Sequence, residues 1–318
     1  MLALLKLLED GQFHSGEELG AALGVSRAAV WKQLKTLQTE LAVPLHSIKG
    51  RGYRLAYPMR LLDEAVLNDH AVWPAHVRTT VGSTNAEAMR LLVEKGESPF
   101  YVVSEQQTHG RGRRGREWVS PFGQNIYYSL VIPIDGGMRQ LEGLSLVVAL
   151  ALLRLVRELG LNSAGLKWPN DLLIGNKKLS GILLELSGDP ADLCHVVIGI
   201  GLNVNMLPSE SEGIGQPWTS LRSELGAPLD RNELILSLNK HLAYYLERQM
   251  KGGFSSLREE WEEHHLWQGR LVSLTSGADP IEGVVLGVGS SGAIKLSIDG
   301  VERSFSGGEL SLRLRDDS

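Results

Sequence analysis

The chain has 318 residues, a formal net charge of −5 and a single cysteine, Cys194. Its length predicts two or three domains, and 43% hydrophobic with 22% charged residues is typical of a globular protein that buries a core. One cysteine excludes a disulfide framework and a cysteine-based zinc site, and no apolar run reaches the length of about eighteen residues that a membrane span needs.

Charge is unevenly distributed along the chain. Residues 1–57 carry a net charge of +2, and the remainder carries −7. A role in binding nucleic acid therefore belongs to the first part of the chain. The opening run MLALLKLLEDG is too short for a secretory segment and contains a lysine. We expect a cytoplasmic protein without a membrane partner.

Residues 1–58 are predicted to form a winged helix-turn-helix domain. A short apolar helix at Leu2–Leu8 is followed by Ser15 and Glu18, which form a capping box for a second helix. Ser26 is placed to cap a third helix, whose apolar residues recur at helical spacing. An extended stretch from Val43, a turn and a second short strand then form the wing.

The exposed face of the third helix and the tip of the wing are basic. Such a helix can enter the major groove of DNA while the wing meets phosphates. The alternative is a small helical docking domain, which would not need these cations. The residues predicted to contact DNA are Ser26, Arg27, Trp31, Lys32, Lys35, Lys49 and Arg51.

A central domain is predicted at residues 62–267, after a linker. Strands and helices alternate there, but hairpins join several of the strands. We therefore expect an α+β domain with a mixed sheet and helices that cover one face of it. The long elements expected are helices from Ser83 to Lys95, 141–159, 230–249 and 257–267, and strands at 77–81, 101–104, 125–132, 179–186 and 195–204.

The run EQQTHGRGRRGR, residues 105–116, alternates glycine with arginine. Glycine lets backbone N–H groups approach an anion, and arginine supplies planar donors that stay charged. The run does not fit the P-loop motif, so P-loop phosphate chemistry is excluded. The alternative is an RG-rich patch that binds nucleic acid.

Other polar residues of the central domain favour an enzyme over that patch. Ser83, Thr84 and Asn85 begin a helix and offer donors for a polar group. Gln106 or Gln107 ends the strand before the arginine loop, with the choice left open. Lys167 and Lys178 follow further on, although a single lysine is usually solvated. Gly181, close to Lys178, leaves room for a flat ligand.

Residues 268–318 change to short alternating strands separated by glycine-rich turns. This pattern predicts a small β-barrel as the third domain.

The motifs together resemble the family of bifunctional biotin protein ligases and biotin-operon repressors. The resemblance covers nearly the whole chain. The motifs that carry it are FHSGEELG, GVSRAAV, KGRGYRL, GSTN, GRGRRGR, KWPNDL, KLSGILLEL, IGIGLNVN and GGELSLR. The resemblance implies an N-terminal winged helix-turn-helix, a ligase core and an SH3-like C-terminal domain.

The resemblance also implies a reaction and its partners. Biotin and ATP, with Mg²⁺, would give biotinyl-5′-AMP and pyrophosphate. The biotin would pass to a lysine of the biotin carboxyl carrier protein of acetyl-CoA carboxylase. The adenylate would act as corepressor, making a homodimer that binds operator DNA and represses biotin synthesis genes.

Site residues follow from the matching motifs. Lys178, Lys167 and Arg113 correspond to the catalytic residues, and Asp171 to a residue acting through Mg²⁺. A segment at 215–221 corresponds to the one that covers the adenine, with Trp218 as its lid. Biotin would meet Ser83, Thr84, Asn85, Gln107, Arg111, Gly112, Arg113, Lys178 and Gly181. The nucleotide would meet Arg111, Arg113, Arg116, Lys167, Asn170, Asp171, Trp218 and Arg313.

Two other functions fit parts of the sequence. A transcription factor that only senses biotin would not need so many cations at the site. A lipoyl ligase could use the same kind of core, but the winged helix and the arginine loop disfavour it. Incubation with ATP, biotin and a carrier domain would distinguish the three.

Overall fold

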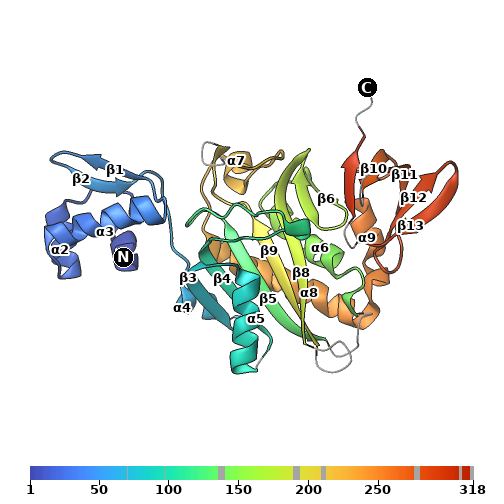
Figure 1. Ribbon diagram of the computed structural model, residues 1–318, viewed down its shortest axis with the longest axis horizontal. Coiled ribbons are helices and arrows are strands. Elements are labelled where there is room, and N and C mark those ends of the chain that lie inside the picture. The colour runs from blue at the N-terminus through green and yellow to red at the C-terminus, as the bar shows by residue number, and fades with distance from the viewer. Residues whose placement is uncertain are drawn as a thin grey trace.

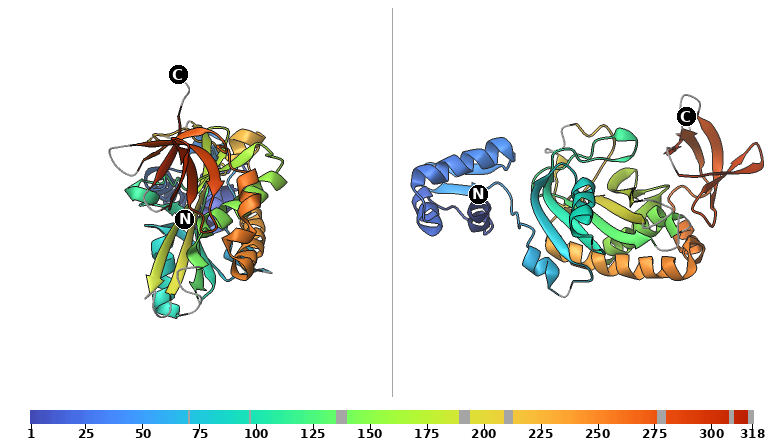
Figure 2. Two further views of the ribbon diagram at one scale, coloured as in Figure 1. Left: turned by 90° about the vertical axis from the view of Figure 1, so that its right-hand side faces the viewer. Right: turned by 60° about the horizontal axis from the view of Figure 1, so that its bottom comes forward.

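The computed structural model describes residues 1–315, except 70, 97, 135–139, 189–193, 209–212, 276–279 and 308–309. Three parts follow one another along the long axis of the molecule (Figure 1). The winged helix lies at one end, the large central sheet in the middle and the C-terminal sheet at the other end, as the turned views also show (Figure 2).

The N-terminal part is the predicted winged helix-turn-helix. Ser15 and Glu18 form the capping box, with Glu18 N–H donating to Ser15 Oγ at 3.1 Å and Ser15 N–H donating to Glu18 Oε2 at 2.8 Å. Ser26 caps the third helix by accepting from Ala29 N–H at 3.2 Å. Its elements are α1 (Leu2–Leu8), α2 (Gly16–Leu23), α3 (Arg27–Glu40), β1 (Leu45–Ile48) and β2 (Gly52–Leu55).

The segment after the wing is fixed to the central part. Arg231 and Glu105 form a buried ion pair, 2.7 Å between Arg231 Nη2 and Glu105 Oε2. The same guanidinium donates to the carbonyl of Arg60, and Glu105 Oε1 accepts from Leu62 N–H. Buried polar groups are stable only when paired, so this network anchors the predicted linker. The helix α4 (Glu64–Asn68), absent from the sequence prediction, follows it.

The predicted mixed sheet is confirmed. Its strand order is β3-β4-β5-β9-β8-β7-β6, with β3 and β4 parallel and the remaining neighbours antiparallel. The strands are β3 (Ala75–Val81), β4 (Phe100–Gln107), β5 (Ile126–Ile134), β6 (Ala164–Lys167), β7 (Asp171–Ile174), β8 (Lys177–Gly188) and β9 (Cys194–Leu202).

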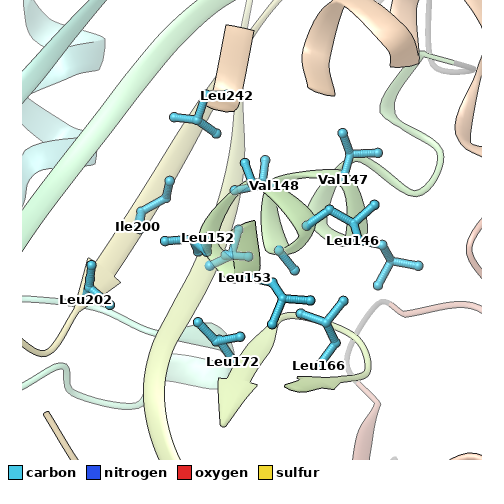
Figure 3. Packing of buried hydrophobic residues seen from close by; sticks show 14 of the residues in the cluster. Leu146, Val147, Val148, Leu152, Leu153, Leu166, Leu172, Ile200, Leu202 and Leu242 are labelled. Carbon is cyan, nitrogen blue, oxygen red and sulfur yellow. The ribbon is translucent and has the colours of Figure 1, made fainter. Parts of the chain in front are cut away.

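Helices cover both faces of this sheet, so the expectation of one covered face was wrong. Successive residues of β4 point to opposite sides: Phe100 and Val102 pack with α5 (Thr84–Lys95), whereas Tyr101 and Val103 pack in the main core. The main core holds α6 (Leu144–Glu158) and α8 (Arg231–Gly252). A strand buried on both faces needs consecutive apolar residues, and the first four residues of β4, 100–103, are all apolar. Figure 3 shows Leu152 of α6 beside Ile200 of β9.

The helix expected at 257–267 is shorter than predicted. Helix α9 (Arg258–Glu263) ends because the next residues pair with β6. Leu166 N–H donates to the carbonyl of His264, and Leu266 N–H donates to the carbonyl of Leu166. Tertiary hydrogen bonds therefore replace the last helical turn. Further short elements also escaped prediction, among them α7 (Leu221–Leu225) and the 3₁₀ turn η4 (Phe254–Ser256).

The C-terminal part is a five-stranded antiparallel sheet in the order β13-β12-β11-β10-β14. It shares the main hydrophobic core, to which Val272 and Leu296 contribute. Buried Trp168 also donates its indole N–H to the carbonyl of Gly292 at 3.0 Å. The strands are β10 (Leu271–Thr275), β11 (Ile281–Val288), β12 (Ile294–Ile298), β13 (Val301–Phe305) and β14 (Ser311–Leu314). Within the described part of the chain, every helix is too short or too polar to cross a membrane.

Candidate active site

One cavity of about 850 Å³ lies between the arginine loop, the central sheet and β14. Its volume is in the range of small-molecule sites. Every residue that the sequence assigned to biotin or to the nucleotide lines it. These are Ser83, Thr84, Asn85, Gln107, Arg111, Gly112, Arg113, Arg116, Lys167, Asn170, Asp171, Lys178, Gly181, Trp218 and Arg313.

One end of the cavity carries neutral polar groups at the start of α5. Gln107 Oε1 accepts from Thr84 N–H at 2.9 Å, and its Nε2 donates to Ser120 Oγ at 3.0 Å. Of the two glutamines between which the sequence left the choice open, Gln107 lines the cavity, whereas Gln106 lies outside it and contacts Thr80. Ser83 stands at the N-cap position of this helix, but its side chain makes no capping hydrogen bond. The free N–H of Thr84 at the start of this helix donates to Gln107 instead.

Asn85 completes the polar end. Its side chain is 3% exposed and lies against the backbone of Gly199, where a Cβ atom would approach Asn85 Oδ1 to 2.4 Å. Asn85 Nδ2 donates to Glu185 Oε2 at 2.7 Å, and Ser129 Oγ lies 2.6 Å from Asn85 Oδ1. The amide is therefore held in one orientation.

The other end of the cavity carries cations. Lys178 Nζ lies 2.6 Å from Asp171 Oδ1, and Lys167 Nζ lies 3.7 Å from Asp171 Oδ2. The two lysine side chains are only 17% and 21% exposed, so neither is a solvated surface residue. Burial lowers the pKa of Lys167, which also lies over the ring of Trp267. Two cations share one carboxylate, leaving positive charge for an anionic ligand.

The arginine loop is a hairpin over the cavity. Gly112 N–H donates to the carbonyl of Arg116, and Trp118 N–H donates to the carbonyl of Gly110. From this hairpin, the Arg113 side chain contacts both the central part and the C-terminal part of the chain. Its Nη1 donates to Asn170 Oδ1 at 3.0 Å, and its Nη2 donates to the C-terminal carbonyls of Gly307 and Leu310, each at 2.8 Å. Burial lowers the pKa of Arg113.

Trp118 is a site residue that the sequence analysis missed. Its indole lies over Gly201 and Gly181, where a Cβ atom would come within 2.4 Å and 3.2 Å of the ring. The flat group above Gly181 in this structure is therefore the protein's own side chain. The signal was the pair Gly199 and Gly201, which face the same side of β9 and remove the side chains that would exclude a ring.

Trp218 and Arg313 flank the cationic end. Lys178 N–H donates to the carbonyl of Pro217, and Thr219 N–H donates to the carbonyl of Lys178, each at 3.0 Å. These bonds fix Trp218 beside the lysine, half-buried. Arg313, on β14, is exposed at the edge of the cavity.

The residues around Asp171 do not form a ready metal site. Both carboxylate oxygens face lysine ammonium groups. No cluster of three His, Cys, Asp or Glu side chains that could hold a metal occurs among the residues that the structure describes. Mg²⁺ in proteins is commonly held by one or two carboxylates together with substrate phosphates.

Comparison with known proteins decides the family. Residues 78–203 match the biotin/lipoate A/B protein ligase family, and residues 1–54 match an HTH domain. The bifunctional ligase/repressor BirA of Salmonella typhimurium is 40% identical over 98% of this chain and 97% of its own; that of Escherichia coli is 38% identical over the same shares. The chain belongs to the biotin protein ligase family.

A solved biotin protein ligase has the same core. The structure from Aquifex aeolicus in complex with biotin and ATP has a TM-score of 0.66 and 30% sequence identity, covering 76% of this ligase and 99% of that chain.

This ligase also presents the predicted DNA-contacting face. The predicted residues on α3 and the wing are exposed, and Trp31 is 56% exposed. Lys35 Nζ lies 5.4 Å from the centre of the Trp31 ring. On the wing, the guanidinium groups of Arg51 and Arg54 lie 4.7 Å and 4.8 Å from the Phe13 ring, which orients them. Ser26 uses its hydroxyl as the helix cap.

Proposed function

We propose that this chain ligates biotin to a carrier protein in two steps and represses biotin synthesis genes as a DNA-binding dimer. The observation that carries the ligase proposal is the cavity itself. It has neutral donors and acceptors at one end and two half-buried lysines at the other, an arrangement that suits biotin's polar ring and its reacting carboxylate.

In the first step, an oxygen of the biotin carboxylate attacks the α-phosphorus of ATP. The bond to the bridging oxygen breaks, and pyrophosphate leaves with that electron pair. Two anions must meet, so cations are needed to offset their repulsion. Lys178 and Lys167 are proposed to supply this charge from one side, and Arg113 from the loop above. Ser83, Thr84, Asn85 and Gln107 are proposed to hold the biotin ring.

The mixed anhydride has to be protected from water until the acceptor arrives. The arginine hairpin covers the cavity and is held at both edges, which supports a role as its lid. In the second step a carrier lysine, as the free amine, attacks the acyl carbon and AMP leaves. The proposed carrier is the biotin carboxyl carrier protein of acetyl-CoA carboxylase. We place both reactions in the cytoplasm.

Mg²⁺ is proposed to enter with the phosphates of ATP. Asp171 would ligate it only if one lysine turned toward the nucleotide, because both of its oxygens are engaged. Trp218 and Arg313 are proposed to lie against the adenine and the phosphates, with Asn170, Arg111 and Arg116 completing the nucleotide side.

The repressor proposal rests on the exposed basic face and on an open sheet edge. Residues 183–188 of β8 pair with β9, but the pairing with β7 stops at Gly181. An unpaired edge can join a second copy. We propose that this edge forms the homodimer when biotinyl-5′-AMP is bound, so that two winged helices reach two half-sites of an operator.

Mass spectrometry distinguishes these proposals from the alternatives. The chain is incubated with ATP, biotin or lipoate, and a carrier domain. We expect the mass of the carrier to rise by one biotinyl group, and only with biotin. A lipoyl adduct would support the other branch of the matched family, and an unmodified carrier with tight biotin binding would support a sensor.

A further inference from the structure

Glu185 lies on β8 and contacts two residues that line the cavity, Asn85 at its polar end and Arg111 in the arginine loop. Its side chain is 27% exposed. Oε2 accepts from Asn85 Nδ2 at 2.7 Å, and Oε1 lies 3.4 Å from Nη2 of Arg111 in the loop. One carboxylate therefore joins two groups that line the cavity but are separate in the chain.

The contact with Asn85 is the stronger of the two. Asn85 is almost fully buried, and its Oδ1 already lies beside Ser129 Oγ. Nδ2 consequently points to Glu185. Without the carboxylate, a buried donor would lose its partner, which costs more than the hydrogen bond itself contributes.

The contact with Arg111 closes a ring of interactions under the lid. From Asn85 the chain of contacts passes through Ser129 to Thr84 and then to Gln107. Gln107 donates to Ser120, whose hydroxyl donates to the carbonyl of Trp118 at the end of the arginine hairpin. One network of contacts therefore connects the hairpin to the polar end of the cavity at two points, through Arg111 and through Trp118.

We propose that Glu185 is a positioning residue for biotin: its negative charge holds the Asn85 amide and Arg111 together, so that the polar end and the lid are set as one unit. This inference rests on the proposed ligase function. Glu185 touches neither reacting group. Its effect is therefore on biotin affinity and on retention of the adenylate, with little effect on the chemical step.

Glu185→Gln separates the two contacts. The glutamine oxygen can still accept from Asn85, but its amide NH₂ cannot pair with a guanidinium. We expect KM for biotin in adenylate formation to rise about threefold, as for a partly exposed ion pair, with kcat nearly unchanged. Glu185→Ala also strands the buried donor, and about a tenfold or larger rise is expected.

A double-mutant cycle tests whether Arg111 is the partner. Glu185→Gln is combined with Arg111→Met, and biotin KM and adenylate dissociation are measured with pyrophosphate release and stopped-flow. We expect the double variant to have neither a higher biotin KM nor faster adenylate dissociation than Arg111→Met alone, because the interaction between the two residues is already lost in that variant. Glu247→Gln is the matched control, because it removes an exposed ion pair, with Lys251, far from the cavity.

Unchanged biotin KM in Glu185→Gln together with additive effects in the cycle would overturn the proposal, even if the alanine variant fails to fold. A fall in kcat alone would overturn it as well, because loss of folded enzyme lowers kcat without altering KM. Failure of the wild-type chain to form biotinyl-adenylate would instead overturn the ligase function.

Discussion

Among the cationic side chains that line the cavity, Lys178, Lys167 and Arg113 are half-buried, and this partial burial strengthens their effect on a ligand. Lys178 and Lys167 share Asp171, and Arg113 donates mainly to neutral oxygens. In a partly dry site, a charge interacts with a ligand more strongly than it would in water. Removing any one of them should therefore affect a different part of the reaction.

Lys178→Ala removes the cation closest to Asp171. Loss of one donor aimed at developing charge typically costs about 10²–10³ in rate. We expect the adenylation rate to fall by that order while the intrinsic DNA affinity of the winged helix stays the same. Lys177→Ala is the matched control, an exposed neighbour on β8 outside the cavity. An adenylation rate within about twofold of wild type would show that Lys178 has no more effect on the reaction than a solvated surface lysine.

Arg113→Ala should make the adenylate leak. The variant loses the hydrogen bonds that hold the hairpin to Asn170 and to the C-terminal carbonyls, and charge-assisted bonds of this kind are the strong ones. We expect the intermediate to dissociate roughly tenfold faster, measured by stopped-flow. Arg303→Ala, an exposed arginine on β13, is the control. Equal dissociation rates for the two variants would contradict the proposal that the arginine hairpin retains the adenylate as a lid.

At the scale of elements, the join between α9 and β6 carries a buried histidine. His265 is 5% exposed, stacks on Trp261 with ring centres 4.7 Å apart, and lies in the segment that pairs with Leu166. Burial lowers the pKa of His265 to about 4. The ring is neutral in the fold, and the unfolded chain binds a proton near pH 6.5.

Stability should therefore fall as the solution is acidified. The contribution of neutral His265 is fully present above about pH 6.5 and is lost as the pH falls toward 4, because the unfolded state then binds the proton first. We expect unfolding free energy to drop by about 2 kcal/mol between pH 7 and pH 5 from this group. Urea denaturation of wild type and His265→Leu at both pH values checks it. An equal drop in unfolding free energy in both proteins would show that other groups cause the pH dependence.

The whole molecule joins its winged helix to the ligase core through shared packing. Phe122, just beyond the arginine hairpin, lies in the same hydrophobic cluster as Met59 and the helices of the winged part. Gly123 fits closely against Met59, since a Cβ atom there would lie 2.5 Å from the sulfur. The DNA-binding part therefore packs directly against the segment that follows the arginine hairpin.

Deleting residues 1–57 should abolish DNA binding and preserve part of the ligase activity. The cavity contains no residue from the deleted segment, but Phe122 and Met59 would lose most of their apolar neighbours. We therefore expect reduced rather than wild-type adenylation, measured beside operator binding by the same preparation. Complete loss of ligation in a folded core would contradict this separation.

Biotin with ATP should promote both dimerisation and operator binding. A single winged helix makes few phosphate contacts and binds weakly at physiological salt, whereas a dimer doubles them. Sedimentation with and without biotinyl-adenylate measures the monomer–dimer equilibrium, and biotin alone is the control. An equilibrium that does not respond would refute the coupling and leave the ligase function unaffected.

The sequence by itself determined the elements and motifs whose causes are local. The capping box at Ser15 and the serine cap at Ser26 depend on neighbours a few residues away, and each was found where the pattern placed it. The mixed sheet and the three parts of the chain followed from the spacing of apolar residues.

Only the tertiary structure decided which distant residues meet. Asn85 and Glu185 are a hundred residues apart and meet because β5 and β9 place α5 over the middle of the sheet. Trp118 fills the space above Gly201 because the arginine hairpin lies over β8 and β9. Residues after α9 left the helix because β6 offered hydrogen bonds that no local propensity records. Burial and pairing between strands are properties of the whole chain, and they select the side chains that complete the site.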